Sequence, residues 1–562
     1  MVARILQLFN KEFTNLHQAA YLLGGFAFLS QLLGLVRDRL LAHFFGAGAT
    51  LDVYYAAFRI PDFLYLTFAS FVSITVLIPF LAERLEYGED GGVARARAFL
   101  DSVFSAFFPI MAAVSAIAFA LAPFLADYIV PGFSGDQKDL FVQLTRILLI
   151  SPIILGVSSL LGSITQTYKK FFVYAGAPVL YNAGIVFGIL FLMPFFGITG
   201  VVYGVLIGSA LHFLVQIPVV ASHGLMPRLS IHHHVADLKK VVALSLPRTI
   251  TLSASSIALM ALIALASRLG EGSIAIFNFS FNLQSAPLSI IGVSYSVAAF
   301  PTLARLFAGG ARERFVEHIT AAARHIIFWS TPAVVLFIVL RAQIVRVVLG
   351  TGAFDWSDTR LTAAALAVFS VSLLAQSLQL LLVRGYYASG RTTAPLVINI
   401  FSAGLTIALG YGLLKLFALS EGFRFFIESL LRIEDLSGTA IVMLPLAYTI
   451  GMIINAILLW GAFGRDFKEF SLSLERAFVQ SFAASIIMGF VAYRVLGILG
   501  DTFNINTFRG IFAEAFWAAT IGLVAGVFVL KILGNREVEE IGGALARRFK
   551  STSTIAPDKE EI

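Results

Sequence analysis

The stretch FVYAGAPVLYNAGIVFGILFLM, residues 172–193, contains no charged side chain and decides what kind of fold this chain can adopt. At a rise of 1.5 Å per residue, a helix of about 20 residues crosses the roughly 30 Å hydrocarbon core of a bilayer. A lone strand would leave its backbone polar groups unpaired in lipid, and the run lacks the alternating pattern of a barrel strand. It therefore predicts a transmembrane helix.

Comparable apolar runs, bounded by charges, Gly and Pro, recur along the whole sequence. The 562 residues are 58% hydrophobic and 13% charged, with a mean hydropathy of +0.88, whereas an average soluble domain is about 25% charged. We predict an all-α polytopic membrane protein with about fourteen transmembrane helices. Their approximate ranges are 18–36, 53–82, 99–126, 140–166, 172–193, 198–221, 239–267, 273–304, 319–340, 361–387, 393–416, 438–462, 474–499 and 508–533.

The distribution of Lys and Arg among the loops predicts how the chain is oriented in the membrane. If the N-terminus is cytoplasmic, the inner loops hold roughly twice as many Lys and Arg as the outer loops, as the positive-inside rule requires. Arg84, Arg228, Arg312 and Arg314 belong to this inner set. The formal net charge of +7 is thus interpreted as membrane topology, with no nucleic-acid partner. We predict a multi-pass protein of the cell (inner) membrane with both termini cytoplasmic and without a cleavable signal peptide.

An internal repeat predicts how the helices are organised. Val72-Ser73-Ile74-Thr75-Val76 with Pro79 is similar to Val293-Ser294-Tyr295-Ser296-Val297 with Pro301, and Ala177-Pro178 with Asn182 is similar to Ala394-Pro395 with Asn399. The common offset of about 220 residues maps the second and fifth spans onto the eighth and eleventh, so an even number of helices separates the copies and the repeat is parallel. We predict two pseudo-symmetric six-helix lobes, residues 1–225 and 226–465, then a C-terminal helix pair at 466–535 and a cytoplasmic tail at 536–562. Two such lobes favour transport through a cavity between them.

Charged residues concentrate in the first two spans. Arg37-Asp38-Arg39 ends the first span, Asp52 precedes the second, and Arg59 and Asp62 lie near its start. Arg59 and Asp62 are three residues apart, so they share one helix face and are close enough to pair, while Pro61 predicts a kink. These groups either snorkel and brace the bundle as ion pairs, or their guanidinium groups bind an anion such as phosphate.

The sequence gives little support for an enzyme active site or for a cofactor or metal site. There are no cysteines, and we find no phosphate-binding loop, zinc-protease motif or nucleophile triad, so we predict neither an enzyme nor a cofactor or metal site. His232-His233-His234 is interpreted as a solvated basic loop, with a metal tract as the alternative. Asn182, Asn278, Asn282, Asn399 and Asn455 are amides inside spans, which more often tie helices together than touch a substrate.

Several stretches, in order along nearly the whole chain, resemble the MurJ/MviN family. The most specific is Leu33-Gly34-Leu35-Val36-Arg37-Asp38 followed by Phe45-Gly46-Ala47-Gly48, Asp52 and Ala57-Phe58-Arg59-Ile60-Pro61. Weaker ones include Pro131-Gly132-Phe133, Leu269-Gly270-Glu271-Gly272-Ser273 and Gly385-Tyr386-Tyr387. The family consists of lipid II flippases within the multidrug/oligosaccharidyl-lipid/polysaccharide exporter superfamily.

The resemblance implies two six-helix lobes plus two C-terminal helices that form a groove for a polyprenyl tail. It implies movement of the undecaprenyl-pyrophosphate-linked peptidoglycan precursor to the outer leaflet, with cavity arginines against its head. Arg37, Asp38 and Arg59 match the family pattern. Family members usually carry Arg where this chain has Gln31, Tyr65 and Asn282, and some carry acidic residues for a coupling cation where it has Leu262 and Ala403.

We therefore expect a flippase of a lipid-linked cell-wall precursor, lipid II being the leading candidate, that works by alternating access. The expected substrate-binding residues are Arg37, Asp38, Arg59, Asp62, Gln31, Asn282 and Asp52. The expected partners are the lipid-linked glycan and membrane lipids. Two alternatives stay open: a flippase or exporter of another polyprenyl-linked oligosaccharide or amphiphile, and a non-transporting scaffold for cell-wall synthesis proteins. The coupling ion and the oligomeric state are left open.

Overall fold

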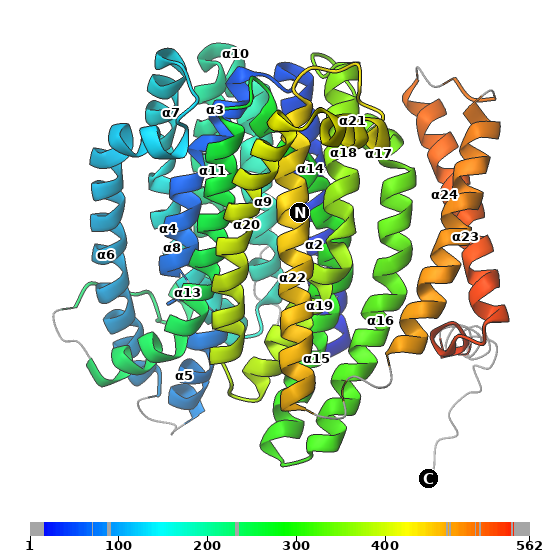
Figure 1. Ribbon diagram of the computed structural model, residues 1–562. Coiled ribbons are helices and arrows are strands. Elements are labelled where there is room, and N and C mark those ends of the chain that lie inside the picture. Colours follow the sequence, from blue (N-terminus) through cyan, green and yellow to red (C-terminus); the bar gives the residue numbers. More distant parts are fainter. Residues whose placement is uncertain are drawn as a thin grey trace, which may run out of the picture. The chain divides into compact units, whose positions relative to one another are not determined.

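The structure is a computed structural model that describes residues 16–540, apart from 70, 73, 87–91, 231–234, 468–469, 471–473, 501 and 505–506, together with residue 543. Within these residues the secondary structure is helical, with no β-strand (Figure 1). The all-α prediction is thereby confirmed, because in lipid a helix satisfies its backbone polar groups within one segment. The histidine tract at 232–234 lies outside the described residues.

The chain divides into two compact units, each assembled from three stretches of sequence. The first comprises Met1–Ser280, Val348–Ala365 and Pro395–Gly451, and the second comprises Phe281–Val347, Leu366–Ala394 and Met452–Ile562. The lobes at 1–225 and 226–465 stay a prediction, because this division groups residues by packing and the predicted one follows the sequence repeat.

The helices that lie in the first unit vary in length, from the 4 residues of α10 to the 38 residues of α6 (Figure 1). They are α2 (Leu16–Phe45), α3 (Ala49–Ala57), α4 (Arg59–Ala69), α5 (Ile74–Glu86), α6 (Gly92–Ile129), α7 (Gly135–Leu148), α8 (Ile150–Thr167), α9 (Phe171–Phe187), the π-helix η1 (Gly188–Leu192), α10 (Met193–Phe196), α11 (Ile198–Leu214), α12 (Ile217–Ser222), α13 (Val235–Ala266), α21 (Glu421–Leu431) and the 3₁₀-helix η3 (Thr439–Val442).

The second unit contains fewer complete helices, and five further helices cross a unit boundary. Those within the second unit are the π-helix η2 (Ser289–Val293), α15 (Ser294–Ala308), α16 (Arg312–Val339), α19 (Leu373–Ala388), α23 (Glu475–Gly500) and α24 (Phe508–Ile532). Those that cross are α14 (Ser273–Leu288), α17 (Arg341–Val348), α18 (Trp356–Val371), α20 (Thr393–Leu419) and α22 (Met443–Asp466).

Eleven segments of the described chain are long and apolar enough to cross a membrane, or up to twelve if α18 and α19, bent by 41°, count as one. A polytopic membrane protein is thus confirmed, while the count of fourteen stays a prediction. The first predicted span lies within α2, and the second is divided among α3, α4 and α5.

The break in the second predicted span occurs at Phe58, before the proline that was expected to kink it. Pro61 occupies the first turn of α4, where backbone N–H groups have no partner within the helix and proline is tolerated. The chain thus changes helix just before Arg59, which places the Arg59 and Asp62 side chains on the opening turn of a new element.

Glycines bring two spans of the first unit into close contact. Gly184 and Gly188, at the end of α9 and the start of η1, face Gly208 and Gly204 of α11. A Cβ atom added to Gly204 would lie 2.6 Å from the Gly188 Cα, and one added to Gly184 would lie 2.4 Å from the Gly208 Cα. Small residues spaced four apart allow this approach, which is how helices associate without a hydrophobic driving force in lipid.

In the second unit α23 and α24 pack along each other, and α16 packs against α15, α19, α23 and α24 (Figure 1). Gly489 of α23 meets Val335 of α16, where an added Cβ would lie 2.4 Å from the Val335 Cγ1. After α24, Asn535 donates to Gln480 Oε1 at 3.1 Å, and Gln480 donates to the Leu533 carbonyl at 2.7 Å. These bonds hold Asn535, the residue just before the predicted tail, against its own unit.

Candidate functional site

Arg37 and Asp38, adjacent near the C-terminal end of α2, form an ion pair. The Arg37 Nη2 lies 2.8 Å from the Asp38 Oδ1, and its Nε donates to the same oxygen at 2.9 Å. Arg37 Nη1 also donates to Asn182 Oδ1 on α9 at 3.5 Å, and Asn182 in turn donates to Ser30 Oγ at 3.1 Å. The arginine side chain keeps 23% of its surface exposed while the carboxylate keeps 5%, so the guanidinium is oriented but still accessible.

Arg59, at the start of α4, donates through Nη2 to Asn278 Oδ1 on α14. Asn278 is itself fixed, because its amide donates to the Ile274 carbonyl at 2.7 Å. The Arg59 Nε is buried and has no hydrogen-bond partner among the described residues. Arg59 thus retains a donor for a further acceptor.

The expected ion pair between Arg59 and Asp62 does not form. Both residues lie on one face of α4, but the guanidinium is drawn to Asn278, and the structure records no ion pair between these two described residues. Asp62 is exposed, although α4 packs against α6, α8 and α13. Its carboxylate is therefore open to a polar group that approaches α4.

Asp52 is buried, 3% exposed, and caps the start of α14 from a distant part of the chain. Its Oδ2 accepts from the Gly272 N–H and its Oδ1 from the Ala275 N–H, both at 2.7 Å. Gly272 is required here, because its φ is +83° and an added Cβ would lie 2.0 Å from the Ala47 carbonyl oxygen. Both carboxylate oxygens of Asp52 are thus engaged by the backbone.

The two neutral candidates lie in different units. Gln31 is half-buried on α2 of the first unit, and Asn282 is half-buried on the part of α14 that belongs to the second unit. Tyr65, on α4 of the first unit, has its hydroxyl 3.1 Å from the Ser159 Oγ on α8.

Three loops of the first unit interlock in what we call the loop clasp, formed by residues 43–47, Gly272 and residues 351–358. The Ala47 N–H donates to Asp358 Oδ2 at 3.0 Å, and the Ala353 N–H donates to the His43 carbonyl at 2.9 Å. Gly352 has a φ of +60°, and an added Cβ would lie 2.3 Å from the His43 carbonyl oxygen. The clasp therefore joins loops that are more than 300 residues apart, as the separation of 311 between Ala47 and Asp358 shows.

A further ion pair of the first unit joins α18 to the loop after α21. Arg360 donates from Nη1 and Nη2 to the two Asp435 carboxylate oxygens at 2.7 and 2.6 Å. These hydrogen bonds hold the pKa of the exposed Asp435 carboxyl below its ordinary value, because they stabilise the charged form.

In chemical terms, the first unit offers two arginines held by fixed partners, each with donor capacity left. Planar guanidinium groups bind phosphate and carboxylate through paired hydrogen bonds. No group of three or more His, Cys, Asp or Glu among the described residues is placed to hold a metal ion. The partners Asn182 and Asn278 carried a sequence signal, an amide inside an apolar span, but nothing in the sequence assigned each to its arginine.

Comparison with known proteins places the chain in a family. The profile of the family described as Lipid II flippase MurJ matches residues 41–513. The chain is 26% identical over 426 residues to a Lipid II flippase MurJ of Burkholderia cenocepacia, a match that covers 71% of this chain and 81% of the relative. It is 27% identical over 527 residues to a probable lipid II flippase MurJ of Haemophilus influenzae, covering 91% and 98%.

Solved structures share the fold. A structure described as Lipid II flippase MurJ in an inward closed conformation matches with a TM-score of 0.70 and 24% identity, covering 93% of this chain and 99% of the other. An inward-facing multidrug resistance MATE transporter of the MOP superfamily matches with a TM-score of 0.61 and 15% identity, covering 79% and 96%.

Apolar helices long enough to cross a membrane, in a fold shared with these solved structures, define the class: a polytopic α-helical membrane protein. Within that class, the chain belongs to the MurJ family of lipid II flippases.

Proposed function

We propose that this protein is a flippase that moves a lipid-linked peptidoglycan precursor, lipid II, from the cytoplasmic to the outer leaflet of the cell membrane by alternating access. The family match over residues 41–513 is the observation that carries the proposal. The lipid tail would stay in the bilayer while the polar head passes through the protein, so the protein must supply donors for the charged head and no catalytic group.

Arg37 and Arg59 are the residues that would contact the pyrophosphate. Asp38 orients Arg37 through the 2.8 Å ion pair. Asn278, in place of Asp62, orients Arg59. The exposed carboxylate of Asp62 would accept hydrogen bonds from the sugar-peptide part of the head, and Gln31 and Asn282 would supply neutral hydrogen bonds. Asp52 would act as a positioning residue through its contacts with the start of α14.

The proposed orientation has both termini in the cytoplasm. The distribution of Lys and Arg supports it. Contacts within the first unit agree, because loops predicted on one side touch each other. On the inner side, Arg84 Nη2 lies 2.7 Å from Asp237 Oδ2, and the Arg228 N–H donates to Asp101 Oδ1 at 2.7 Å. The loop clasp and the Arg360–Asp435 pair likewise join segments that are predicted on the outer side.

The proposed lobes, 1–225 and 226–465, would move against each other, and the pair α23–α24 within 466–535 would provide a groove for the polyprenyl tail. The exposed apolar side chains Val524, Phe528 and Ile532 of α24 fit contact with lipid, since they are 66%, 63% and 68% exposed.

Transport of labelled lipid II by the protein reconstituted in vesicles tests the proposal. We expect Arg37→Ala and Arg59→Ala each to reduce the initial transport rate by about ten- to a hundredfold, since each removes charged hydrogen bonds of about 1.5–3 kcal/mol. Arg509→Ala, an exposed residue at the start of α24, serves as the control and should transport at the normal rate. Absence of lipid II transport by the unaltered protein, beside an active relative in the same vesicles, would overturn the proposal.

A second candidate substrate is another polyprenyl-linked oligosaccharide. The neutral side chains Gln31, Tyr65 and Asn282, at positions where relatives usually carry Arg, favour it, and Tyr65 is engaged with Ser159. Native mass spectrometry of the purified protein separates the two candidates, because co-purified lipid II would count against the second.

A further inference from the structure

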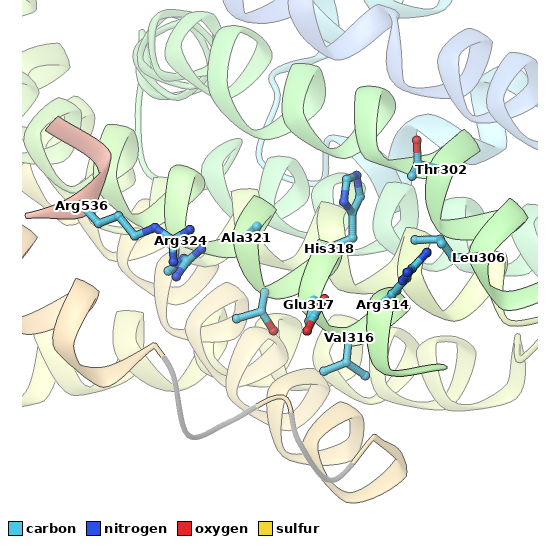
Figure 2. Close-up of a pocket in the computed structure, with 10 residues that line it drawn as sticks. Thr302, Leu306, Arg314, Val316, Glu317, His318, Ala321, Arg324 and Arg536 are labelled. Carbon is cyan, nitrogen blue, oxygen red and sulfur yellow. The ribbon is translucent and has the colours of Figure 1, made fainter. Parts of the chain in front are cut away.

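The second unit contains a pocket of about 810 Å³ between the end of α15, the first half of α16 and the segment that follows α24 (Figure 2). Its volume lies within the roughly 300–1,000 Å³ that is typical of ligand sites. None of the residues proposed to bind the transported substrate lines it.

Cationic side chains dominate the lining. Arg314 and Arg324 come from α16, Arg536 comes from the segment after α24, and His318 lies between the two α16 arginines (Figure 2). The residues 314, 317, 318, 321 and 324 recur at intervals of three and four, so they form one stripe on the helix. Ala321, in the middle of this stripe, leaves room where a larger side chain would fill the pocket. Glu317 is the acidic residue of the lining.

The arginines keep donor groups available. The Arg324 Nε lies 3.6 Å from Glu537 Oε1, too far for a hydrogen bond, and is buried without a hydrogen-bond partner in the described chain. Arg536 uses its Nε to pair with Glu540 at 2.7 Å. Glu537 and Glu540 thus each lie beside the Nε of their arginine. The structure records no bond from the amino groups of Arg324 or Arg536, or from Arg314, to another described residue.

A buried hydroxyl in the lining also lacks a partner. Thr320 is 7% exposed, and its Oγ1 forms no hydrogen bond with any described residue. A buried polar group without a partner costs stability, and nearly all such groups in proteins are satisfied. Thr320 and the amino groups of the arginines therefore suit a ligand rich in acceptor oxygens.

We propose that this pocket binds a phosphodiester or phosphomonoester of a polyol, carried either by an anionic lipid headgroup or by a soluble ester. The phosphate oxygens accept from Arg314, Arg324 and Arg536, as guanidinium groups favour. The Glu317 carboxylate accepts from a hydroxyl of the polyol. The lining belongs to the predicted cytoplasmic side, where anionic lipids concentrate and basic pockets between helices bind their headgroups.

Native mass spectrometry of the full chain in detergent tests the site with phosphatidylglycerol as the probe and phosphatidylcholine as the zwitterionic comparison. We expect preferential retention of phosphatidylglycerol. Arg314→Gln and Ala321→Trp should each weaken it by about tenfold, since the first removes a charged hydrogen-bond donor and the second fills the pocket. Arg312→Gln, an exposed arginine of α16 outside the lining, should leave retention unchanged.

A parallel thermal-shift titration with glycerol 3-phosphate identifies the source of the phosphate group. A shift that disappears in Arg314→Gln assigns the site to a soluble ester, and lipid retention with the same dependence assigns it to a headgroup. Both results support the site. The proposal is overturned if neither probe binds better to the unaltered protein than to Arg314→Gln, a substitution of an exposed residue that leaves the fold intact. Neither result bears on transport of lipid II.

Discussion

At the scale of single residues, the charged groups of the first two spans divide by how their hydrogen-bonding capacity is used. Asp52 has both oxygens engaged by backbone amides. The Arg59 Nε is buried without a partner among the described residues, and Asp62 is exposed. A group whose capacity is filled by the fold stabilises it, whereas an exposed group with capacity to spare, such as Asp62, is available to a substrate.

This difference predicts that Asp52→Asn acts on stability. The amide can accept through one oxygen only, and its NH₂ would face a second N–H donor. We expect a loss of about 1–3 kcal/mol, seen as a lower apparent melting temperature in detergent. The matched control is Asp136→Asn, an exposed carboxylate in the first turn of α7, where at most about 1 kcal/mol of helix-dipole stabilisation is lost. Equal melting temperatures for both variants would contradict the assignment of Asp52 as a cap.

At the scale of elements, the loop clasp joins the α2–α3 connection to the α13–α14 turn and to the loop before α18. The loops approach each other most closely at positive-φ glycines, Gly46, Gly272 and Gly352, where an added Cβ would lie 2.0 to 2.7 Å from a backbone oxygen of another loop. If the protein alternates between two open states, this contact on the predicted outer side must separate in one of them. The clasp is therefore expected to act as an outer gate.

Weakening the clasp should open that gate more often. The chain has no cysteine, so Leu66→Cys, one turn beyond Asp62 on α4, provides a single thiol for an impermeant maleimide added from outside. In this background Asp358→Ala should raise the labelling rate by about tenfold, because it removes a charged hydrogen bond from the closed state.

The control for this experiment is Asp127→Ala, which breaks the exposed 2.6 Å pair with Lys138 outside the clasp. It should leave the labelling rate unchanged. Unchanged labelling in Asp358→Ala as well would show that the clasp does not control access.

At the scale of the whole molecule, contacts between loops can be compared with the sides of the membrane that the sequence predicts for them. The number of Lys and Arg residues assigns each loop to a side of the membrane by itself. Contacts such as Arg84–Asp237 and Ala47–Asp358 instead require that the two loops they join lie on the same side. Each of these contacts joins two loops that were predicted on the same side. An odd error in the number of spans predicted between two such loops would have placed them on opposite sides.

This agreement predicts that peptide tags at both ends of the chain are cytoplasmic. Protease added to intact spheroplasts should spare both tags and digest them only after lysis. A tag inserted after Ser134, in the predicted outer loop before α7, is the control and should be digested in intact spheroplasts. Digestion of either terminal tag before lysis would reverse the proposed topology.

Much of the fold could be predicted from the sequence because a transmembrane helix is encoded within about 20 consecutive residues. The all-α class and the α9 span followed directly from the apolar run at 172–193. The division of the second predicted span into α3, α4 and α5 did not follow, because the break at Phe58 depends on packing that hydropathy does not describe.

The sequence by itself determined the solvent of this protein, the predicted sides of its loops and which arginines merit attention, since these depend on composition and local order. Only the tertiary structure decided which residues form hydrogen bonds with these charged side chains. Arg59 bonds to Asn278, 219 residues away, rather than to Asp62 on its own helix, and Asp52 caps a helix 220 residues later. The phosphate pocket likewise joins α16 to Arg536 across the chain. Such choices depend on which surfaces the packed helices bring together, and no local pattern encodes that.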